Sequence, residues 1–163
     1  MGGYDRIDVL VTDFDGTVVN EDLPHIALER YGRHGWQAVG ARMSRGEVTF
    51  EDGLTAMYSM IGANQETVVS LGRSTTTLRR GFPALQSTCH ENGIKIVVVS
   101  AGLDFLIRDA MERFDIRVDR LVCPTTKYEG GAFRARFPRF SPPSRNFKDL
   151  ITWTWCFRNI GKG

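Results

Sequence analysis

Two carboxylates spaced by one residue, Asp13 and Asp15, are the side chains of this sequence that point most directly to chemistry. They lie in the run Asp-Phe-Asp-Gly-Thr at 13–17, near the N-terminus. Because successive strand side chains point to opposite faces, a turn after the strand lets Asp13 face an electrophilic phosphorus atom while Asp15 reaches the leaving oxygen. We therefore expect Asp13 to attack and Asp15 to carry the proton. An ordinary surface turn is the alternative for an Asp-Gly pair.

The residues before these carboxylates predict how they are placed. Residues 7–12 are mostly β-branched and apolar, which suits a strand buried in a sheet. Gly16 permits a sharp exit from such a strand, because glycine adopts backbone conformations that other residues avoid. In open α/β sheets, ligands bind at the carboxyl ends of the strands. The sequence therefore places both carboxylates where a ligand site is expected.

A second apolar run ends in a similar way. Residues 94–99 are mostly β-branched, and Ser100, Ala101 and Gly102 follow them before the helical pattern at 103–114. Ser100 can donate its hydroxyl, and the two amides after it lie near the start of a helix, where partial positive charge favours anions. This pattern is typical of a phosphate cradle. Capping of the helix by Ser100 is the alternative.

Together the two strand ends resemble the first two motifs of the haloacid dehalogenase (HAD) superfamily. The resemblance runs from about residue 9 to residue 148, and it points to the phosphoserine-phosphatase-like branch. It implies an α/β fold with a Rossmann-like parallel sheet, and a phosphatase acting on a small phosphorylated metabolite through an aspartyl-phosphate intermediate. Asp13 would be the nucleophile and Asp15 the proton carrier, and both would bind Mg²⁺ as the cofactor.

The resemblance also implies residues that hold the phosphate. Thr17, Ser100 and the amides of Ala101 and Gly102 would contact the phosphoryl oxygens. By its distance beyond Ser100, Lys148 fits the lysine that neutralises phosphate in this family. An isolated lysine is more often a solvated surface charge, so that alternative stays open for Lys148.

The segment between the two motifs predicts a small helical cap inserted after the first strand. Helical patterns separated by glycines cover most of this segment, at 23–31, 36–43, 50–61 and 65–71. The insertion resembles the cap of the phosphoserine-phosphatase-like branch, which would close over the site and exclude water. The expected organisation is a core made of 1–19 and 81–163 with a cap made of 20–80. The alternative is that these helices complete the core.

Two cap positions bear on the substrate. Relatives that act on phosphoserine use a cap arginine to hold the substrate carboxylate and a cap glutamate near the nucleophile loop. By alignment, Met57 occupies the position of the arginine and Asp22 that of the glutamate. Since Met57 cannot pair with a carboxylate, we expect a substrate other than phosphoserine, such as a more apolar, sugar-type or enol phosphate. Packing of Met57 in the core is the alternative.

Beyond the second motif, the sequence predicts a third strand at 118–123 and a β-hairpin at 126–137 around a Glu-Gly-Gly turn. Basic residues interleave with aromatic residues here, a pattern that also occurs in proteins that bind single-stranded nucleic acid. The formal charge of the chain is only +2, and a half-buried strand alternates in the same way, so we expect no nucleic-acid partner. The basic residues after position 130 are Arg134, Arg136, Arg139, Arg145, Lys148, Arg158 and Lys162.

The C-terminal segment departs from the family pattern. A fourth motif, a Gly-Asp pair with a further Asp that completes the magnesium site, does not follow Lys148. A helix, a turn and a strand would need on the order of twenty residues there. From about residue 150 the sequence is Trp-rich, and we expect an out-of-frame tail or a fragment end; an aromatic strand is the alternative. We then expect weak or no turnover and poor stability for the isolated chain, or a phosphate-binding remnant.

The composition fits one hydrophobic core. The chain has 163 residues, 42% of them hydrophobic, and contains no apolar run of membrane-spanning length and no signal-peptide pattern, so we expect a cytoplasmic protein without a membrane partner. Its three cysteines and three histidines lack metal-ligand spacing, which favours reduced thiols. The oligomeric state is left open by the sequence.

Overall fold

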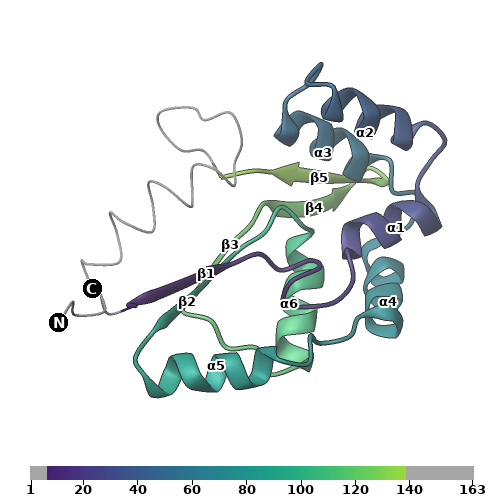
Figure 1. Ribbon diagram of the computed structural model, residues 1–163. Helices are drawn as coiled ribbons and strands as arrows, with labels where there is room; N and C mark the ends of the chain where they lie inside the picture. The colour runs from purple at the N-terminus through teal and green to yellow at the C-terminus, as the bar shows by residue number, and fades with distance from the viewer. Residues whose placement is uncertain (1–6, 139–163) are drawn as a thin grey trace.

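The computed structural model describes residues 7–138, so the predictions for Lys148 and for the segment after residue 150 lie outside the described residues. The described part is an α/β structure, as predicted (Figure 1). Its elements follow in the order β1 (Val9–Thr12), α1 (Leu23–Tyr31), α2 (Trp36–Ser44), α3 (Phe50–Ser59), α4 (Gln65–Thr75), α5 (Phe82–Glu91), β2 (Lys95–Val99), α6 (Asp104–Arg113), β3 (Arg120–Val122), β4 (Thr125–Glu129) and β5 (Ala132–Arg136).

A parallel sheet with the strand order β1-β2-β3 forms the centre of the structure. Thr12 pairs with Val98, and Val98 pairs with Leu121, so the carboxyl ends of β1 and β2 lie side by side. The side chains of β2 from Ile96 to Val99 are all buried, which explains why this strand is a continuous apolar run. The predicted parallel sheet is confirmed.

The third strand is shorter than predicted. It covers Arg120–Val122 instead of 118–123. Before it, the Asp119 carboxylate accepts a hydrogen bond from the Ile96 amide at 2.8 Å, while the Asp119 amide donates to the Ile96 carbonyl at 2.9 Å. A side chain therefore satisfies a backbone donor that a longer strand would have paired, and the regular pairing begins one residue later.

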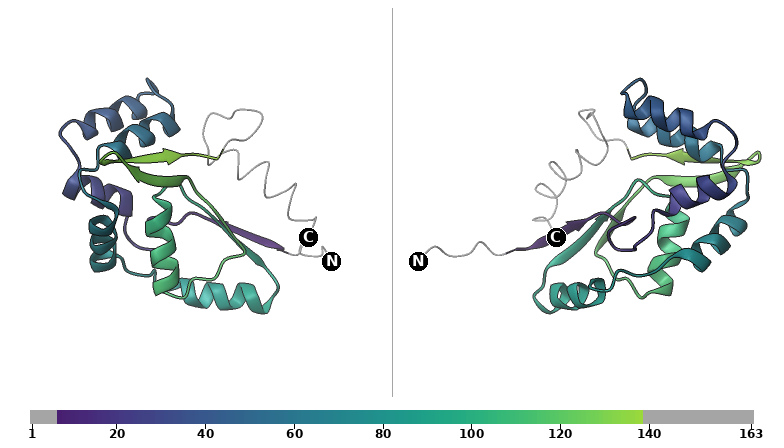
Figure 2. Two further views of the ribbon diagram at one scale, coloured as in Figure 1. Left: turned by 180° about the vertical axis from the view of Figure 1, so that it is seen from behind. Right: turned by 45° about the vertical axis from the view of Figure 1, so that its right-hand side comes forward.

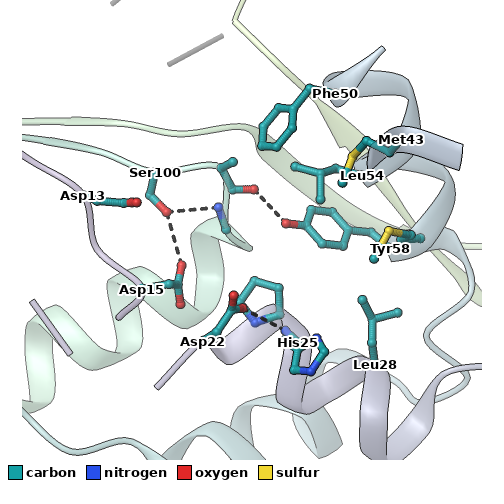
Figure 3. A pocket seen from close by; sticks show the side chains of 14 residues that line it. Asp13, Asp15, Asp22, His25, Leu28, Met43, Phe50, Leu54, Tyr58 and Ser100 are labelled. Carbon is teal, nitrogen blue, oxygen red and sulfur yellow. Dashed lines mark hydrogen bonds between the residues drawn. The ribbon is translucent and has the colours of Figure 1, made fainter. Parts of the chain in front are cut away.

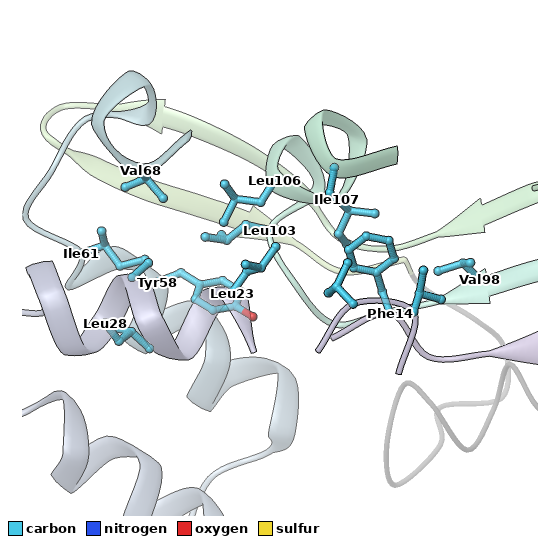
Figure 4. Close-up of a cluster of buried hydrophobic side chains, with 14 of the residues drawn as sticks. Phe14, Leu23, Leu28, Tyr58, Ile61, Val68, Val98, Leu103, Leu106 and Ile107 are labelled. Carbon is cyan, nitrogen blue, oxygen red and sulfur yellow. The ribbon is translucent and has the colours of Figure 1, made fainter. Parts of the chain in front are cut away.

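The main hydrophobic core joins the sheet to the helices between β1 and β2. Figure 4 shows Phe14 beside Val98 and Ile107, and the ring of Tyr58 among Leu23 and Leu103. Phe14 and Tyr58 are among the largest fully buried side chains. At about 25 cal/mol per Å² of apolar surface, each such ring stabilises the fold by a few kcal/mol, roughly 2 to 3. This core holds the loop after β1 against the inserted helices.

The four helices predicted between the two motifs are all present. Helix α1 has the predicted bounds, with Asp22 as its N-cap, and Thr49 and Asn64 cap α3 and α4 in the same way. Figures 1 and 2 show α2 and α3 as a pair that lies over β5, whereas α4 packs on α6. The division into a core and a cap at residues 19 and 80 stays a prediction.

The predicted hairpin is formed by β4 and β5, which make a separate two-stranded sheet. Its turn residues Gly130 and Gly131 have φ values of 60° and 76°, which the turn of a tight hairpin requires. Phe133 is fully buried and stacks on Phe105 at 5.4 Å between ring centroids, whereas Arg134 is exposed. Alternation across a half-buried strand therefore accounts for the basic and aromatic pattern.

Candidate active site

The loop after β1 turns both carboxylates toward one cavity. Phe14 points into the core and is fully buried, so its neighbours on either side face away from the core. The Val18 amide donates to the Phe14 carbonyl at 2.9 Å, and Gly16 has a φ of 69°, so the chain makes a tight turn there. The Phe14 amide donates to Oδ1 of Asp13 at 2.8 Å. These local contacts fix the direction of the Asp13 carboxylate.

Asp15 is held by two donors from different parts of the chain. The Leu23 amide donates to Oδ1 of Asp15 at 3.0 Å, and the Ser100 hydroxyl donates to Oδ2 at 3.3 Å. Burial raises the pKa of Asp15 from 3.8 to about 7, and the nearby charges of Asp22 and Asp13 act in the same direction. The two hydrogen bonds oppose this shift but do not cancel it. Asp15 therefore titrates near neutral pH.

The loop after β2 provides the opposite side of the site. Ser100 is 1% exposed, and its hydroxyl accepts a hydrogen bond from the Gly102 amide at 3.0 Å. The N-cap of α6 is Leu103, so capping of the helix by Ser100 does not occur. A Cβ atom at Gly102 would lie 2.5 Å from Oδ2 of Asp15 and 3.2 Å from Oγ of Ser100. A glycine at this position therefore lets the two loops approach each other.

The side chain of Arg79 binds the loop after β1. Its Nε atom donates to the Thr17 carbonyl at 2.7 Å, and its Nη2 atom donates to the Gly16 carbonyl at 2.5 Å. The Arg79 amide also donates to the Val18 carbonyl at 3.0 Å. The segment that follows α4 is thus hydrogen-bonded to the tight turn after β1.

A cavity of about 300 Å³ opens over these groups, and its two ends differ in chemistry (Figure 3). Side chains from α1, α2 and α3 close the end away from the sheet. The polar residues lining the cavity are Asp13, Asp15, Asp22, His25, Tyr58, Ser100 and Gly102. The more apolar ones are Pro24, Leu28, Met43, Phe50, Leu54, Met57 and Ala101.

Most of the site residues predicted from the sequence meet at this cavity. Asp13 and Asp15 line it together with Ser100, Ala101 and Gly102, and so do the two cap positions Asp22 and Met57. Asp22 also caps α1, since its Oδ1 accepts from the His25 amide at 3.0 Å. Thr17 is exposed and lies outside the lining, so its contact with phosphate stays a prediction.

The donors present fit a hard divalent cation bound through few carboxylates. Asp13 and Asp15 offer oxygen ligands, which Mg²⁺ prefers, and among the described residues that line the cavity there is no lysine or arginine to repel it. Residues 7–138 contain no cluster of three or more His, Cys, Asp or Glu side chains suited to a metal. Such a site fits an ion that completes its shell with water and substrate oxygens, as Mg²⁺ commonly does.

Sequence reasoning missed two residues of this site. Tyr58 was not among the predicted site residues, yet its hydroxyl donates to the Ala101 carbonyl at 2.7 Å. Arg79 was not recognised at all. The helical spacing of Leu54, Met57 and Tyr58 places them on one face of α3, which was the available signal for Tyr58. No pattern in the sequence indicated what that face meets.

The fold and the site define an α/β protein whose paired carboxylates lie beside the loop Ser100–Gly102 at the end of the neighbouring parallel strand. Residues 10–146 match the family model of the haloacid dehalogenase-like hydrolases. The chain therefore belongs to this family, and the predicted family membership is confirmed.

Curated relatives add a chemical context. The chain is 27% identical over 131 residues to the 2-hydroxy-3-keto-5-methylthiopentenyl-1-phosphate phosphatase of Geobacillus kaustophilus, a match that covers 80% of this chain and 59% of the relative. The protein with the same name in Brevibacillus brevis is 22% identical with the same coverage. The chain thus spans about three-fifths of the length of these relatives.

Solved structures show the same fold. A HAD-family hydrolase from Salmonella enterica serovar Typhi matches with a TM-score of 0.67 at 18% identity, covering 80% of this chain and 45% of that one. A phosphoserine phosphatase from T. onnurineus matches with a TM-score of 0.63 at 22% identity, covering 86% of this chain and 70% of that one.

No helix in residues 7–138 meets the length and apolarity that a bilayer crossing requires.

Proposed function

We propose that this chain carries the site of a phosphatase that hydrolyses a small phosphomonoester. One observation carries the proposal: Asp13, Asp15, Ser100 and Gly102, which come from the ends of two adjacent parallel strands, line a single cavity. A carboxylate nucleophile, a second carboxylate two residues away and a buried hydroxyl with a backbone amide are the groups that phosphoryl transfer through an aspartate needs.

The reaction divides into two steps. In the first, an oxygen of Asp13 attacks phosphorus, the bond from phosphorus to the ester oxygen breaks, and Asp15 gives its proton to the leaving alkoxide. In the second, Asp15 takes a proton from water, which attacks the aspartyl-phosphate, releases inorganic phosphate and restores Asp13. The hydrogen bond from the Leu23 amide holds the Asp15 carboxyl group in the lining of the cavity, and the Ser100 hydroxyl, which donates to Asp15 in the empty cavity, would turn to a phosphoryl oxygen when substrate binds.

The Asp13 carboxylate and the backbone carbonyl of Asp15 would hold Mg²⁺, which offsets negative charge on the phosphoryl group when it is bound. The chain's own residues supply the remaining contacts. Ser100 and Gly102 line the same side of the cavity after the second strand, and we place the phosphoryl oxygens there. Thr17 and Lys148 complete this set as predictions from the family resemblance.

The cavity also favours an ester with an apolar portion. Opposite the carboxylates, Met43, Leu54 and Met57 line the wall formed by α2 and α3. Met57 is 8% exposed and offers no charge to a substrate carboxylate. The names of the curated relatives specify a phosphate ester that carries a methylthio group, which would suit this wall. Phosphoserine would leave its ammonium and carboxylate groups against apolar side chains.

Phosphate release from a matched pair of esters tests the proposal. The chain, in excess over substrate and with Mg²⁺, is given n-pentyl phosphate or phosphoserine, and inorganic phosphate is followed in a single turnover. We expect faster release from the pentyl ester, and no release by Asp13→Asn. Release that survives Asp13→Asn, or a preference for phosphoserine, would contradict the proposal.

A further inference from the structure

We propose that Tyr58 is a positioning residue, whose hydroxyl on helix α3 fixes the direction of the Gly102 amide at the phosphate end of the cavity. This inference rests on the proposed function only in assigning phosphate to this end of the cavity. The contacts themselves are present in the structure and can be tested without turnover.

The first step is the geometry of one peptide group. The Tyr58 hydroxyl donates to the Ala101 carbonyl at 2.7 Å. That carbonyl and the Gly102 amide belong to the same planar peptide unit, in which they point in opposite directions. A bond that holds the carbonyl oxygen toward α3 therefore also sets the direction of the Gly102 N–H.

The second step is what the Gly102 amide reaches. It donates to Oγ of Ser100 at 3.0 Å, and the Ser100 hydroxyl donates to Oδ2 of Asp15 at 3.3 Å. Figure 3 shows these bonds as a connected path from the ring of Tyr58 through the 101–102 peptide and Ser100 to Asp15. The path joins α3 to the loop that carries the nucleophile.

The residues of this hydrogen-bonded path are buried. Tyr58 and Ser100 are each 1% exposed, and Ala101 is 8% exposed, so little water can replace a lost donor. Burial also raises the pKa of Tyr58 well above its usual value, with Asp15 and Asp22 adding to the shift. The phenol therefore stays protonated and remains a donor. Without it, the peptide would lose the bond that fixes its rotation.

The same helix also forms the apolar wall. Leu54 and Met57 line the cavity from α3, one turn and one residue before Tyr58 respectively. Contacts that a ligand makes with this wall hold α3 in place, and through Tyr58 they hold the 101–102 peptide. The two ends of the cavity are thereby coupled through one hydroxyl.

The test compares two tyrosine variants in the full 163-residue chain. Tyr58→Phe keeps the ring and removes only the hydroxyl. Tyr128→Phe is the matched control, because Tyr128 lies on β4, is 37% exposed and does not line the cavity. In ¹⁵N-labelled protein, the hydrogen-exchange rate and chemical shift of the Gly102 amide are measured first, and inorganic phosphate is then titrated with Mg²⁺ present.

We expect the Gly102 amide to exchange about tenfold faster in Tyr58→Phe, and phosphate to bind about tenfold more weakly, with both values unchanged in Tyr128→Phe. A purely packing role would leave the Gly102 amide as it is in the wild type. A folded Tyr58→Phe with wild-type exchange and wild-type phosphate affinity would therefore overturn the inference.

Failure of the variant to fold and failure of the wild type to bind phosphate can be told apart. If Tyr58→Phe does not fold, the hydrogen-exchange rate of the Gly102 amide in the wild type decides. The inference requires this amide to exchange more slowly than the exposed amides of the hairpin turn, and fast exchange overturns it. If the wild type does not bind phosphate, the proposed function fails. The exchange comparison at Gly102 still supports or overturns the role of Tyr58.

Discussion

The Ser100 hydroxyl lies 3.3 Å from Oδ2 of Asp15, although 85 positions separate the two residues in the sequence. The contact follows from the parallel pairing of β1 with β2, which aligns Thr12 with Val98 and brings the residues after each strand to one edge. The carboxyl group that we propose as the general acid thus accepts a hydrogen bond from the hydroxyl that we place beside the phosphate.

Replacing Asp15 by Asn should stabilise the metal-free protein at alkaline pH. The pKa of Asp15 is about 7 in the folded chain, above the ordinary value of 3.8, so between these pH values the unfolded state binds fewer protons than the native state. The free energy of unfolding contributed by this group therefore falls as pH rises from about 4 to 7 and stays lower above 7. Asp15→Asn removes that loss, on the order of 2 to 4 kcal/mol at pH 8.

Urea unfolding with EDTA at pH 4 and pH 8 measures this effect. The difference between variant and wild type should be larger at pH 8 than at pH 4. A variant whose advantage is the same at both pH values, or absent, would show that Asp15 is not disfavoured as an anion in the folded chain.

Replacing Gly102 by Ala should disrupt the site. The added Cβ would lie 2.5 Å from Oδ2 of Asp15, so the carboxylate must move and the bond from Ser100 is lost. We expect phosphate binding to weaken by about tenfold or more, measured by calorimetry. Gly81→Ala is the control, because a Cβ at Gly81 meets nothing within 4 Å and its φ of −86° suits alanine. Equal affinities in the two variants would contradict the close approach of the loops.

Removing the side chain of Arg79 should slow the reaction without changing the cavity lining. Arg79→Ala loses the bonds to the Gly16 and Thr17 carbonyls, so the loop that carries both carboxylates becomes less fixed. We expect the single-turnover rate to fall by about tenfold, a modest loss of orientation. The neighbouring Arg80→Ala removes the same charge at an exposed position and should react like the wild type. Equal rates in both variants would rule out this role for Arg79.

Shortening Met57 should weaken binding of apolar esters selectively. Met57 lines the cavity, and Met57→Ala removes apolar contact with the substrate, so the KM for n-pentyl phosphate should rise about tenfold while that for glycerol phosphate changes little. Met60→Ala is the control, since Met60 ends the same helix but lies outside the lining. A parallel change for both esters would place the ester tail elsewhere.

Local signals in the sequence were sufficient for most elements of the fold, although α5 was not predicted and β3 was predicted too long. Apolar β-branched runs predicted β1 and β2, and α1 starts where Asp22 can cap it. The two carboxylates and Ser100 could also be predicted, because each directly follows a strand whose carboxyl end faces the ligand crevice.

Contacts that depend on tertiary placement could not be predicted. Arg79 reaches the Thr17 carbonyl across 62 positions, and Tyr58 reaches the Ala101 carbonyl across 43. Backbone carbonyls have no sequence signature, so nothing marks them as partners. Met57 was predicted either to contact substrate or to pack in the core; it is buried in the core cluster and also lines the cavity.

Chemical trapping of the acyl phosphate tests the central claim, that Asp13 is the nucleophile, most directly. The chain is mixed with a phosphomonoester and Mg²⁺, treated with borohydride, which reduces an aspartyl-phosphate to homoserine, and digested for peptide mass spectrometry. We predict homoserine at position 13, in an amount that depends on substrate, and none in Asp13→Asn. Homoserine at another aspartate, or phosphate release without any reduced aspartate in the wild type, would contradict the account.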